Sequence, residues 1–309
     1  MNPIVAKLPL IRRPFYQRDV ARQKCERALQ ERDAALCERD AALRERDAAL
    51  RERDARILEQ SRSVPSADMS SGTTKRLICV LCQNRVDSWL PFDLTPSDFR
   101  IRLGTIGSNP NRFSCPSCGA IDRERHLCLF LERLRLMEPV RGGSVLHIAP
   151  EPRFREYVTS FDLGTYFQGD LSPAHESIQR VDMQQMAFLD ASFDMVICNH
   201  SLEHVDDVTA AIREMCRVLK PGGRAVCQTP YAARLSTTFE DPLLQSPADR
   251  LFFYGQEDHV RQFGADIEQR LRDGGLRGRL VPHEEILPDI DPVAYGVNEK
   301  EPFFDFVRD

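Results

Sequence analysis

Residues 144–152, SVLHIAPEP, predict a strand that turns directly into a helix. Pro152 suits the first helical turn, because the amide proton that proline lacks is not needed there. Strand-like and helix-like segments then alternate along the chain. Strands are expected at Ser144–Ile148, Thr165–Gly169, Gln179–Asp182, Phe193–Asn199 and Arg224–Thr229, and helices near Phe154–Ser160, Ala174–Ser177, Asp207–Leu219 and Gly264–Asp273.

This alternation predicts an α/β fold, in which a parallel sheet is covered by helices on both faces. Upstream of it, His126–Met137 has the apolar spacing of a helix. Downstream, Arg279–Glu285 and Phe303–Val307 are expected to close the sheet as a pair of strands.

The composition describes one sizeable core with appendages. The chain has 309 residues, of which 42% are hydrophobic and 29% charged, with a formal net charge of −5. Residues 1–71 hold 15 Lys/Arg against 12 Asp/Glu, which leaves 27 against 35 for residues 72–309. The acidic body disfavours binding to a bare phosphate backbone, although a local basic patch is still compatible with it.

Hydropathy and cysteine usage indicate a cytoplasmic protein. The sequence has no apolar run long enough for a membrane span, and its first residues lack the apolar core and cleavage site of a secretory signal. Six cysteines are scattered, as expected for thiols in a reducing compartment. They are Cys25, Cys37, Cys128, Cys198, Cys216 and Cys227.

The N-terminal region is predicted to be a tail (1–17), a long helix (18–60) and a flexible linker (61–74). Four repeats of the type ALxERDA place leucines seven residues apart, at Leu29, Leu36, Leu43 and Leu50. The other core position of each heptad is charged, so two interpretations stay open. The helix forms either a weak coiled coil that joins copies of the chain into an oligomer, or a solvated spacer.

Residues 75–126 are predicted to form a zinc module, followed by the main domain at 127–309. The pairs Cys79–Cys82 and Cys115–Cys118 have the spacing of two knuckles that hold one Zn²⁺ with four sulfurs. Four occupied positions leave none for a catalytic water, so the predicted zinc is structural. Four reduced thiols without metal, or redox chemistry, are the alternatives.

A nucleoside cofactor is expected at the carboxyl ends of the strands. Asp170 follows the second strand, 19 residues after Glu151, where a carboxylate can accept hydrogen bonds from both ribose hydroxyls. The turn at Ala149–Glu151 lacks the glycines that a pyrophosphate needs and carries a negative charge, which disfavours NAD. A cofactor with a sulfonium and an ammonium group, S-adenosylmethionine (SAM), suits this turn better.

Two segments carry a family resemblance. FDMVICNHSLEH (Phe193–His204) and EMCRVLKPGG (Glu214–Gly223) resemble the class I SAM-dependent methyltransferases of the type-11 group. The resemblance covers about Ser144–Pro230 and implies a Rossmann-like, doubly wound, mostly parallel seven-stranded sheet. The turn His147–Glu151 departs from the acidic residue and glycine-rich loop that are usual in this family.

The resemblance implies roles for individual residues. Asp170 would hold the ribose, Asp182 the adenine amino group, and Met183 the adenine ring edge through its backbone. Asn199 and His200 would line the methionine half, beside the turn residues His147, Ala149 and Glu151. Simpler structural roles compete with these: Asp170 could cap a turn, Asp182 could be a solvated loop acid, and Glu151 could be favoured by a helix dipole alone.

Methyl transfer to a hydroxyl group needs a base that takes the proton. The candidates are His200 and His204 after the fourth strand, and His259 in the insertion Tyr231–Phe263, which is long enough to cover a substrate. Glu240, Asp241 and Arg261 could bind polar substrate groups or form surface ion pairs.

The predicted function is methyl transfer to a small-molecule or carbohydrate acceptor, at oxygen. Asn199 is followed by His200 and Ser201 rather than by Pro-Pro-aromatic, which disfavours amino methylation of DNA bases. Cys198 and Cys227 lie within strands, which disfavours carbon-5 methylation of pyrimidines. Two alternatives stay open: an RNA methyltransferase whose zinc module grips RNA, supported by Arg123, Arg125, Arg133 and Arg135, and a non-catalytic adaptor.

Overall fold

The computed structural model describes residues 76–92 and 96–309. The predicted tail, repeat helix and linker therefore lie outside the described residues. All described residues belong to one compact unit, Met69–Asp309. The cysteine module and the large sheet can thus be treated together.

The large sheet of the described residues has seven strands in the order β11-β12-β8-β7-β4-β5-β6. β12 runs antiparallel to both of its neighbours, and the other adjacent pairs are parallel. This arrangement confirms the predicted doubly wound, mostly parallel α/β fold. The strands are β4 (Ser144–Ile148), β5 (Thr165–Asp170), β6 (Gln179–Arg180), β7 (Phe193–Ile197), β8 (Leu219–Val226), β11 (Leu276–Val281) and β12 (Phe303–Arg308).

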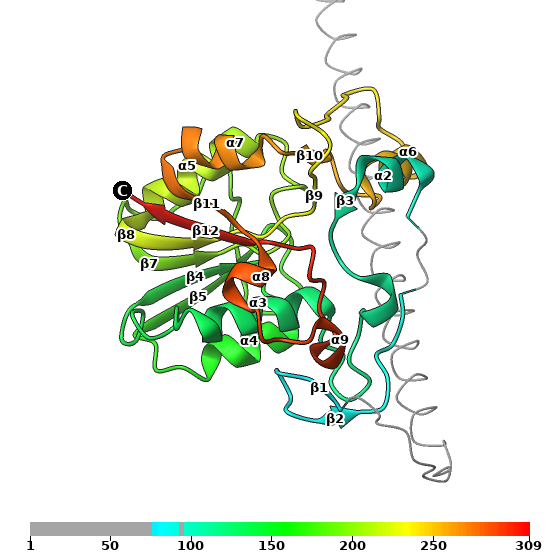
Figure 1. Cartoon of the computed structure of the whole chain (residues 1–309). Coiled ribbons are helices and arrows are strands. Elements are labelled where there is room, and N and C mark those ends of the chain that lie inside the picture. The colour runs from blue at the N-terminus through cyan, green and yellow to red at the C-terminus, as the bar shows by residue number, and fades with distance from the viewer. Residues whose placement is uncertain (1–75, 93–95) are drawn as a thin grey trace, which may run out of the picture. The chain divides into compact units, whose positions relative to one another are not determined.

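Helices cover both faces of this sheet. They are α3 (Asp122–Arg133), α4 (Pro152–Thr159), α5 (Val208–Val218), α7 (Ile267–Asp273), α8 (His283–Ile286) and α9 (Pro292–Tyr295). Side chains alternate along β4, so that Leu146 enters one core and Val145 the other. The first core includes residues of α5 and α7, and the second includes residues of α3, α4 and α8 (Figure 1).

Several predicted bounds differ from the structure. The predicted helix Ala174–Ser177 is wrong, because these residues form bends and a turn in which the Ser177 amide donates to His175 Nδ1. β8 begins at Leu219 and ends at Val226, so the predicted turn at Lys220–Gly223 is an irregularity inside the strand. The helix expected from Gly264 begins at Ile267, and the helix expected from His126 begins at Asp122.

A smaller lobe joins two segments that are far apart in the sequence. Strand β3 of the cysteine module pairs with β9 of the insertion, which in turn pairs with β10. Phe99 of α2 packs against Phe239 and Phe253 of the insertion, with ring centroids 5.9 and 5.1 Å apart. The elements are β1 (Leu77–Ile78), β2 (Arg85–Val86), α2 (Asp98–Leu103), β3 (Thr105–Ile106), the 3₁₀ turn η1 (Pro110–Arg112), β9 (Tyr231–Ala232), α6 (Pro247–Tyr254) and β10 (Phe263–Gly264).

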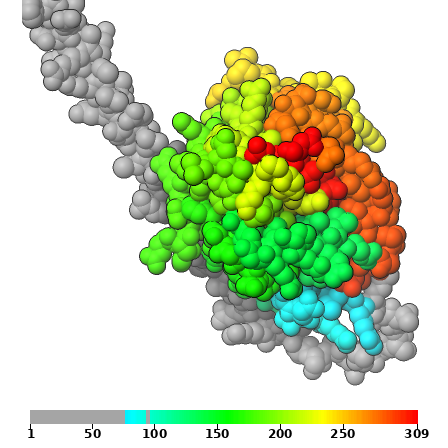
Figure 2. All heavy atoms as spheres, turned by 90° about the vertical axis from the view of Figure 1, so that its left-hand side faces the viewer, coloured from blue at the N-terminus to red at the C-terminus, as the bar shows by residue number. Residues whose placement is uncertain are grey.

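The small lobe lies at the carboxyl ends of the parallel strands (Figure 1). Figure 2 views the opposite end of the sheet, and there the C-terminal residues lie at the surface. Ligands of doubly wound sheets bind at the carboxyl ends of the strands. The small lobe is therefore placed to cover a bound ligand.

Arg125 of α3 ties the cysteine module to the domain. Its guanidinium is completely buried, lies 4.2 Å from the centre of the Trp89 ring, and donates to backbone carbonyls of three segments. The acceptors are the carbonyls of Arg112, Phe113, Ala120, Tyr295 and Gly296. A buried arginine thus supplies the hydrogen bonds that these irregular segments cannot make for themselves.

Replacing Arg125 should therefore destabilise the fold. Arg125→Met keeps most of the volume but leaves several buried carbonyls without donors, and we expect a loss of about 3 kcal/mol or more in the free energy of unfolding. Urea unfolding would measure it. The control Arg135→Met removes an exposed partner of Glu138 and should change stability by less than about 1 kcal/mol. Equal losses in the two variants would contradict the role of Arg125.

Candidate functional site

The turn after β4 keeps a shape that usually requires glycine. Ala149 has a positive φ of 48°, and its amide donates to the Gly169 carbonyl at 2.7 Å. The sequence has no glycine in this turn, and a strained alanine takes its place without loss of the turn. A left-handed alanine costs about 1–2 kcal/mol.

Glu151 points into the site and does not cap the following helix. It occupies the N-cap position of α4 but makes no side-chain capping bond there. Its Oε1 accepts a hydrogen bond of 2.8 Å from Asn199 Nδ2, and its Oε2 lies 3.5 Å from His147 Nε2. Burial would raise the pKa of Glu151, but His147 and Arg123 hold it below its usual range. The simple helix-dipole role is thus not what the contacts show.

A glycine at position 149 tests whether the positive φ of Ala149 strains the turn. Ala149→Gly should leave the free energy of unfolding unchanged or raise it by up to about 1 kcal/mol, because glycine adopts this φ without a steric penalty. Chemical denaturation would measure the difference. Ala191→Gly is a matched control, since Ala191 also has a positive φ, of 54°, but lies outside the site. A clear loss of stability in Ala149→Gly alone would contradict the strain.

The two predicted nucleoside-binding acids lie after β5 and β6. Asp170 Oδ1 accepts from the Ser172 amide at 2.7 Å, and among the described residues its other oxygen has no hydrogen bond. Asp182 Oδ1 accepts from the amide and the side chain of Gln184, at 2.9 and 3.1 Å. Met183, next to it, is buried. Both acids therefore stabilise turns, and Asp170 keeps one oxygen for a ligand.

All three predicted histidines gather with a carboxylate between them. His200 Nδ1 lies 3.4 Å and His259 Nε2 lies 3.9 Å from the same oxygen, Glu203 Oε1. Burial would raise the pKa of Glu203, but His200, His259 and His204 hold it well below its usual range. The rings of His204 and His259 are 4.6 Å apart and perpendicular. The structure thus brings the predicted acceptor-side residues into one cluster.

The three histidines have different surroundings. His200 has a positive φ of 52°, and its two ring nitrogens face Glu203 and Glu301. Burial would lower the pKa of His200, but these two carboxylates raise it above its usual value. Burial lowers the pKa of His259 to about 4. The side chain of His204 is one-third exposed, and its Nδ1 lies 3.3 Å from Asp258 Oδ2.

Sequence reasoning did not single out three further residues of the site, and it considered a fourth, Arg123, only as a contact to RNA. Glu203 and Asp258 each precede a predicted histidine, which was the available signal. Glu301 gave no signal, because it lies far along the chain from His200. Arg123, from the first turn of α3, acts on the pKa values of Glu151, His200 and His204, and its buried Nε has no hydrogen-bond partner among the described residues.

Arg261 has a structural role rather than the substrate-binding role considered from the sequence. Its guanidinium is 2% exposed and donates to the carbonyls of Leu202, Val205 and Asp206. It also pairs with Glu240 at 2.9 Å. Arg261 therefore fixes the loop that carries Glu203 and His204.

The thiols of Cys198 and Cys227 are not reactive, since burial raises the pKa of Cys227 to about 12 and that of Cys198 well above its usual value.

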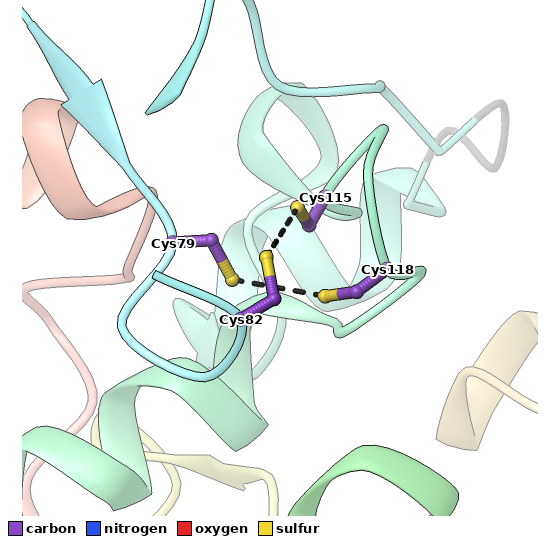
Figure 3. Close-up of side chains that lie close together, drawn as sticks. All are labelled: Cys79, Cys82, Cys115 and Cys118. Carbon is purple, nitrogen blue, oxygen red and sulfur yellow. Dashed lines mark hydrogen bonds between the residues drawn. The ribbon is translucent and has the colours of Figure 1, made fainter. Parts of the chain in front are cut away.

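The four paired cysteines converge on one point (Figure 3). Cys79 Sγ lies 3.8 Å from Cys118 Sγ, and Cys82 Sγ lies 4.0 Å from Cys115 Sγ. Four sulfurs at the Zn–S distance of about 2.3 Å in a tetrahedron are about 3.8 Å apart. The spacing fits one zinc ion. None of the four forms a disulfide.

Removing a metal from these cysteines should loosen the small lobe. Cys115→Ser, or a chelator added under reducing conditions, should lower the melting temperature by about 6–12 °C if about 3 kcal/mol is lost. Calorimetry together with zinc analysis would measure both effects. Cys216→Ser lies outside the cluster and should keep both zinc and stability. A purified protein without zinc that melts as the wild type does would contradict the site.

The comparisons with known proteins concern the central part of the chain. Residues 141–227 match the family model described as a methyltransferase domain. The uncharacterized methyltransferase YcgJ of Bacillus subtilis is 34% identical over 84 residues, which cover 27% of this chain and 31% of YcgJ. The O-methyltransferase resE of Aspergillus sclerotiorum is 28% identical over 134 residues, which cover 40% of this chain and 44% of that protein. The chain thus spans less than half the length of these relatives.

Two solved structures resemble somewhat more than half of the chain. The crystal structure of YcgJ from Bacillus subtilis has a TM-score of 0.38 at 18% identity and covers 59% of this chain and 95% of that one. A SAM-dependent methyltransferase from Mesorhizobium loti has a TM-score of 0.39 at 18% identity and covers 58% and 96%.

The sheet order is that of a doubly wound, mostly parallel α/β fold, and Glu151 and Asn199 meet at its carboxyl edge. The family match and the curated relatives show that residues 141–227 resemble a methyltransferase domain. In the part of the chain that the structure describes, no helix is both long and apolar enough to cross a membrane.

Proposed function

We propose that this protein transfers a methyl group from SAM to a hydroxyl group of a small-molecule or carbohydrate acceptor. The observation that carries the proposal is the set of polar side chains at the point where β4 lies between β5 and β7. Neighbouring connections diverge at such a point and leave a crevice for a ligand. Glu151 and Asn199 follow β4 and β7, and Asp170 is the last residue of β5.

The unsatisfied atoms of this crevice fit SAM. Glu151 Oε2 and Asn199 Oδ1 are buried and have no hydrogen-bond partner among the described residues. The SAM ammonium group would supply the donors and the positive charge that these two acceptors lack. Asp170 would hold the ribose hydroxyls, and Asp182 with Met183 would hold the adenine. SAM supplies an electrophilic methyl group on its sulfonium.

Arg123 adds a cation to the same end of the crevice. Its charge lowers the pKa values of Glu151 and His200, and its buried Nε, which has no hydrogen-bond partner among the described residues, suits a carboxylate ligand. We infer that Arg123 binds the carboxylate of the SAM methionine. The zwitterion would then lie between Arg123 and Glu151.

His204 is the proposed base for the acceptor. It is the most exposed of the three clustered histidines, and Asp258 orients its ring. The acceptor oxygen would attack the methyl carbon while the carbon–sulfur bond breaks and His204 Nε2 takes the hydroxyl proton. S-adenosylhomocysteine and the methyl ether are the products. His200 and His259, both buried, would position the cluster around Glu203.

The small lobe would cover the acceptor, and a structural zinc on Cys79, Cys82, Cys115 and Cys118 would hold its shape. Three of the four arginines that favoured an RNA acceptor have partners within the protein. Arg125 is buried against backbone carbonyls, and Arg133 and Arg135 form ion pairs with Asp289 and Glu138. These contacts support a small acceptor over RNA. A cytoplasmic location, and an oligomer formed through the N-terminal helix, stay predictions.

Titration calorimetry with SAM and S-adenosylhomocysteine tests the cofactor site. Asp170→Ala should weaken both ligands by at least about tenfold, because it removes charge-assisted hydrogen bonds of about 1.5–3 kcal/mol each. Asp162→Ala, an exposed acid just before the same strand, should bind as the wild type does. Absence of binding to the wild type would support the adaptor alternative instead.

Replacing the base should slow methyl transfer without loss of the cofactor. In a screen of hydroxyl acceptors followed by S-adenosylhomocysteine release, His204→Gln should lower kcat by about 10²-fold and leave the Kd of SAM within about twofold. Equal activity of His204→Gln and wild type on the accepted substrate would overturn the role of His204 as base.

A further inference from the structure

We propose that Glu203, His204 and His259 form a second metal site, which binds one divalent first-row transition-metal ion. One ligand atom from each residue lies within 4.8 Å of the other two. Glu203 Oε1 and His259 Nε2 are 3.9 Å apart. This separation is too long for a hydrogen bond. Two ligand atoms at about 2.0–2.2 Å from a tetrahedral ion lie about 3.5 Å apart, so a small rotation of either side chain would bring both onto one ion.

In each proposed ligand, the side-chain nitrogen or oxygen that would not bind the ion already faces a protein group. His259 Nδ1 lies 3.0 Å from the Tyr254 carbonyl and must donate to it, so Nε2 keeps its lone pair. His204 Nδ1 faces Asp258, and Glu203 Oε2 accepts from the Thr229 hydroxyl at 2.9 Å. Metal-binding histidines are oriented in this way by a carbonyl or a carboxylate on the other ring nitrogen.

The atoms of Glu203 and His259 that would bind the ion lack hydrogen-bond partners among the described residues. Glu203 Oε1 and His259 Nε2 are buried and make no hydrogen bond within the described residues. A carboxylate oxygen facing an imidazole lone pair is repelled unless a cation lies between them.

The backbone around the cluster is fixed before any ion binds. The Val260 amide donates to the Glu203 carbonyl at 3.0 Å, which joins the loop after β7 to the insertion. Arg261 holds the carbonyls of Leu202, Val205 and Asp206. A metal site is selective when its ligands are held in place in this way.

The donor set distinguishes this site from the cysteine cluster. Two imidazoles and one carboxylate suit Mn²⁺, Fe²⁺ or Zn²⁺, whereas four thiolates select Zn²⁺. Three protein ligands leave coordination positions open, and the exposed side of His204 gives access to them. The role of such an ion rests on the proposed function: bound there, it would hold the acceptor hydroxyl and lower its pKa, and His204 would serve as the base only in the ion-free protein.

Metal analysis of the full chain tests the site without reference to activity. After equilibration with a zinc buffer, the wild type should hold two zinc ions per chain, and Glu203→Gln and His259→Asn should each hold one. His175→Asn, an exposed histidine outside both clusters, should keep two. A wild type with one zinc, or unchanged zinc content in Glu203→Gln, would overturn the proposal in favour of His200 as the sole counter-charge of Glu203.

Titration with Mn²⁺, followed by electron paramagnetic resonance, tests the site without zinc. The wild type should remove the signal of free Mn²⁺ up to one equivalent, because thiolates bind this ion poorly. Asp258→Asn should weaken Mn²⁺ binding by about 10–100-fold through the orientation of His204. No loss of the Mn²⁺ signal together with a single zinc would overturn the site.

SAM titrations of the same proteins separate the two proposals. Glu203→Gln and His259→Asn should bind SAM as the wild type does, because neither residue is placed at the cofactor. Binding of metal without binding of SAM in the wild type would overturn the proposed function and leave the metal site standing. Binding of SAM without a second metal would overturn the metal site and leave the proposed function standing.

Discussion

The buried guanidinium of Arg125 is the interaction on which the arrangement of the parts depends. It donates to carbonyls of the cysteine module and of the segment before β12, and it stacks on Trp89. Removing a charged group from water is costly unless every donor is used, and here several carbonyls converge on it. The small lobe is thereby held at the carboxyl ends of the sheet.

Opposite charges concentrate at those strand ends. Glu203 and Glu301 are buried there, Glu151 is partly buried, and each faces at least one histidine. A cationic cofactor, or a divalent ion, suits this surplus of buried carboxylates better than a phosphate would. The same reasoning explains why the acidic turn after β4 is compatible with a cofactor although it lacks glycine.

The predictions succeeded where a short segment determines its own structure. β4 and the CxxC pairs were located from local sequence, since a buried strand needs consecutive apolar residues and a knuckle needs fixed spacing. The helix expected at Ala174–Ser177 failed, because four residues are too few to compensate for helix nucleation without tertiary support. Arg125 was mistaken for a surface charge, because sequence alone does not reveal burial.

The sequence by itself determined the strand-turn-helix unit and the two CxxC knuckles, and it pointed to His200, His204 and His259 as candidate residues. Only the tertiary structure decided that Glu301 joins His200, and that the insertion pairs with β3 of the cysteine module. The reason is physical. Local patterns report on neighbours within a few residues, whereas contacts between distant segments depend on the order of strands in the sheet and on which buried polar groups find partners.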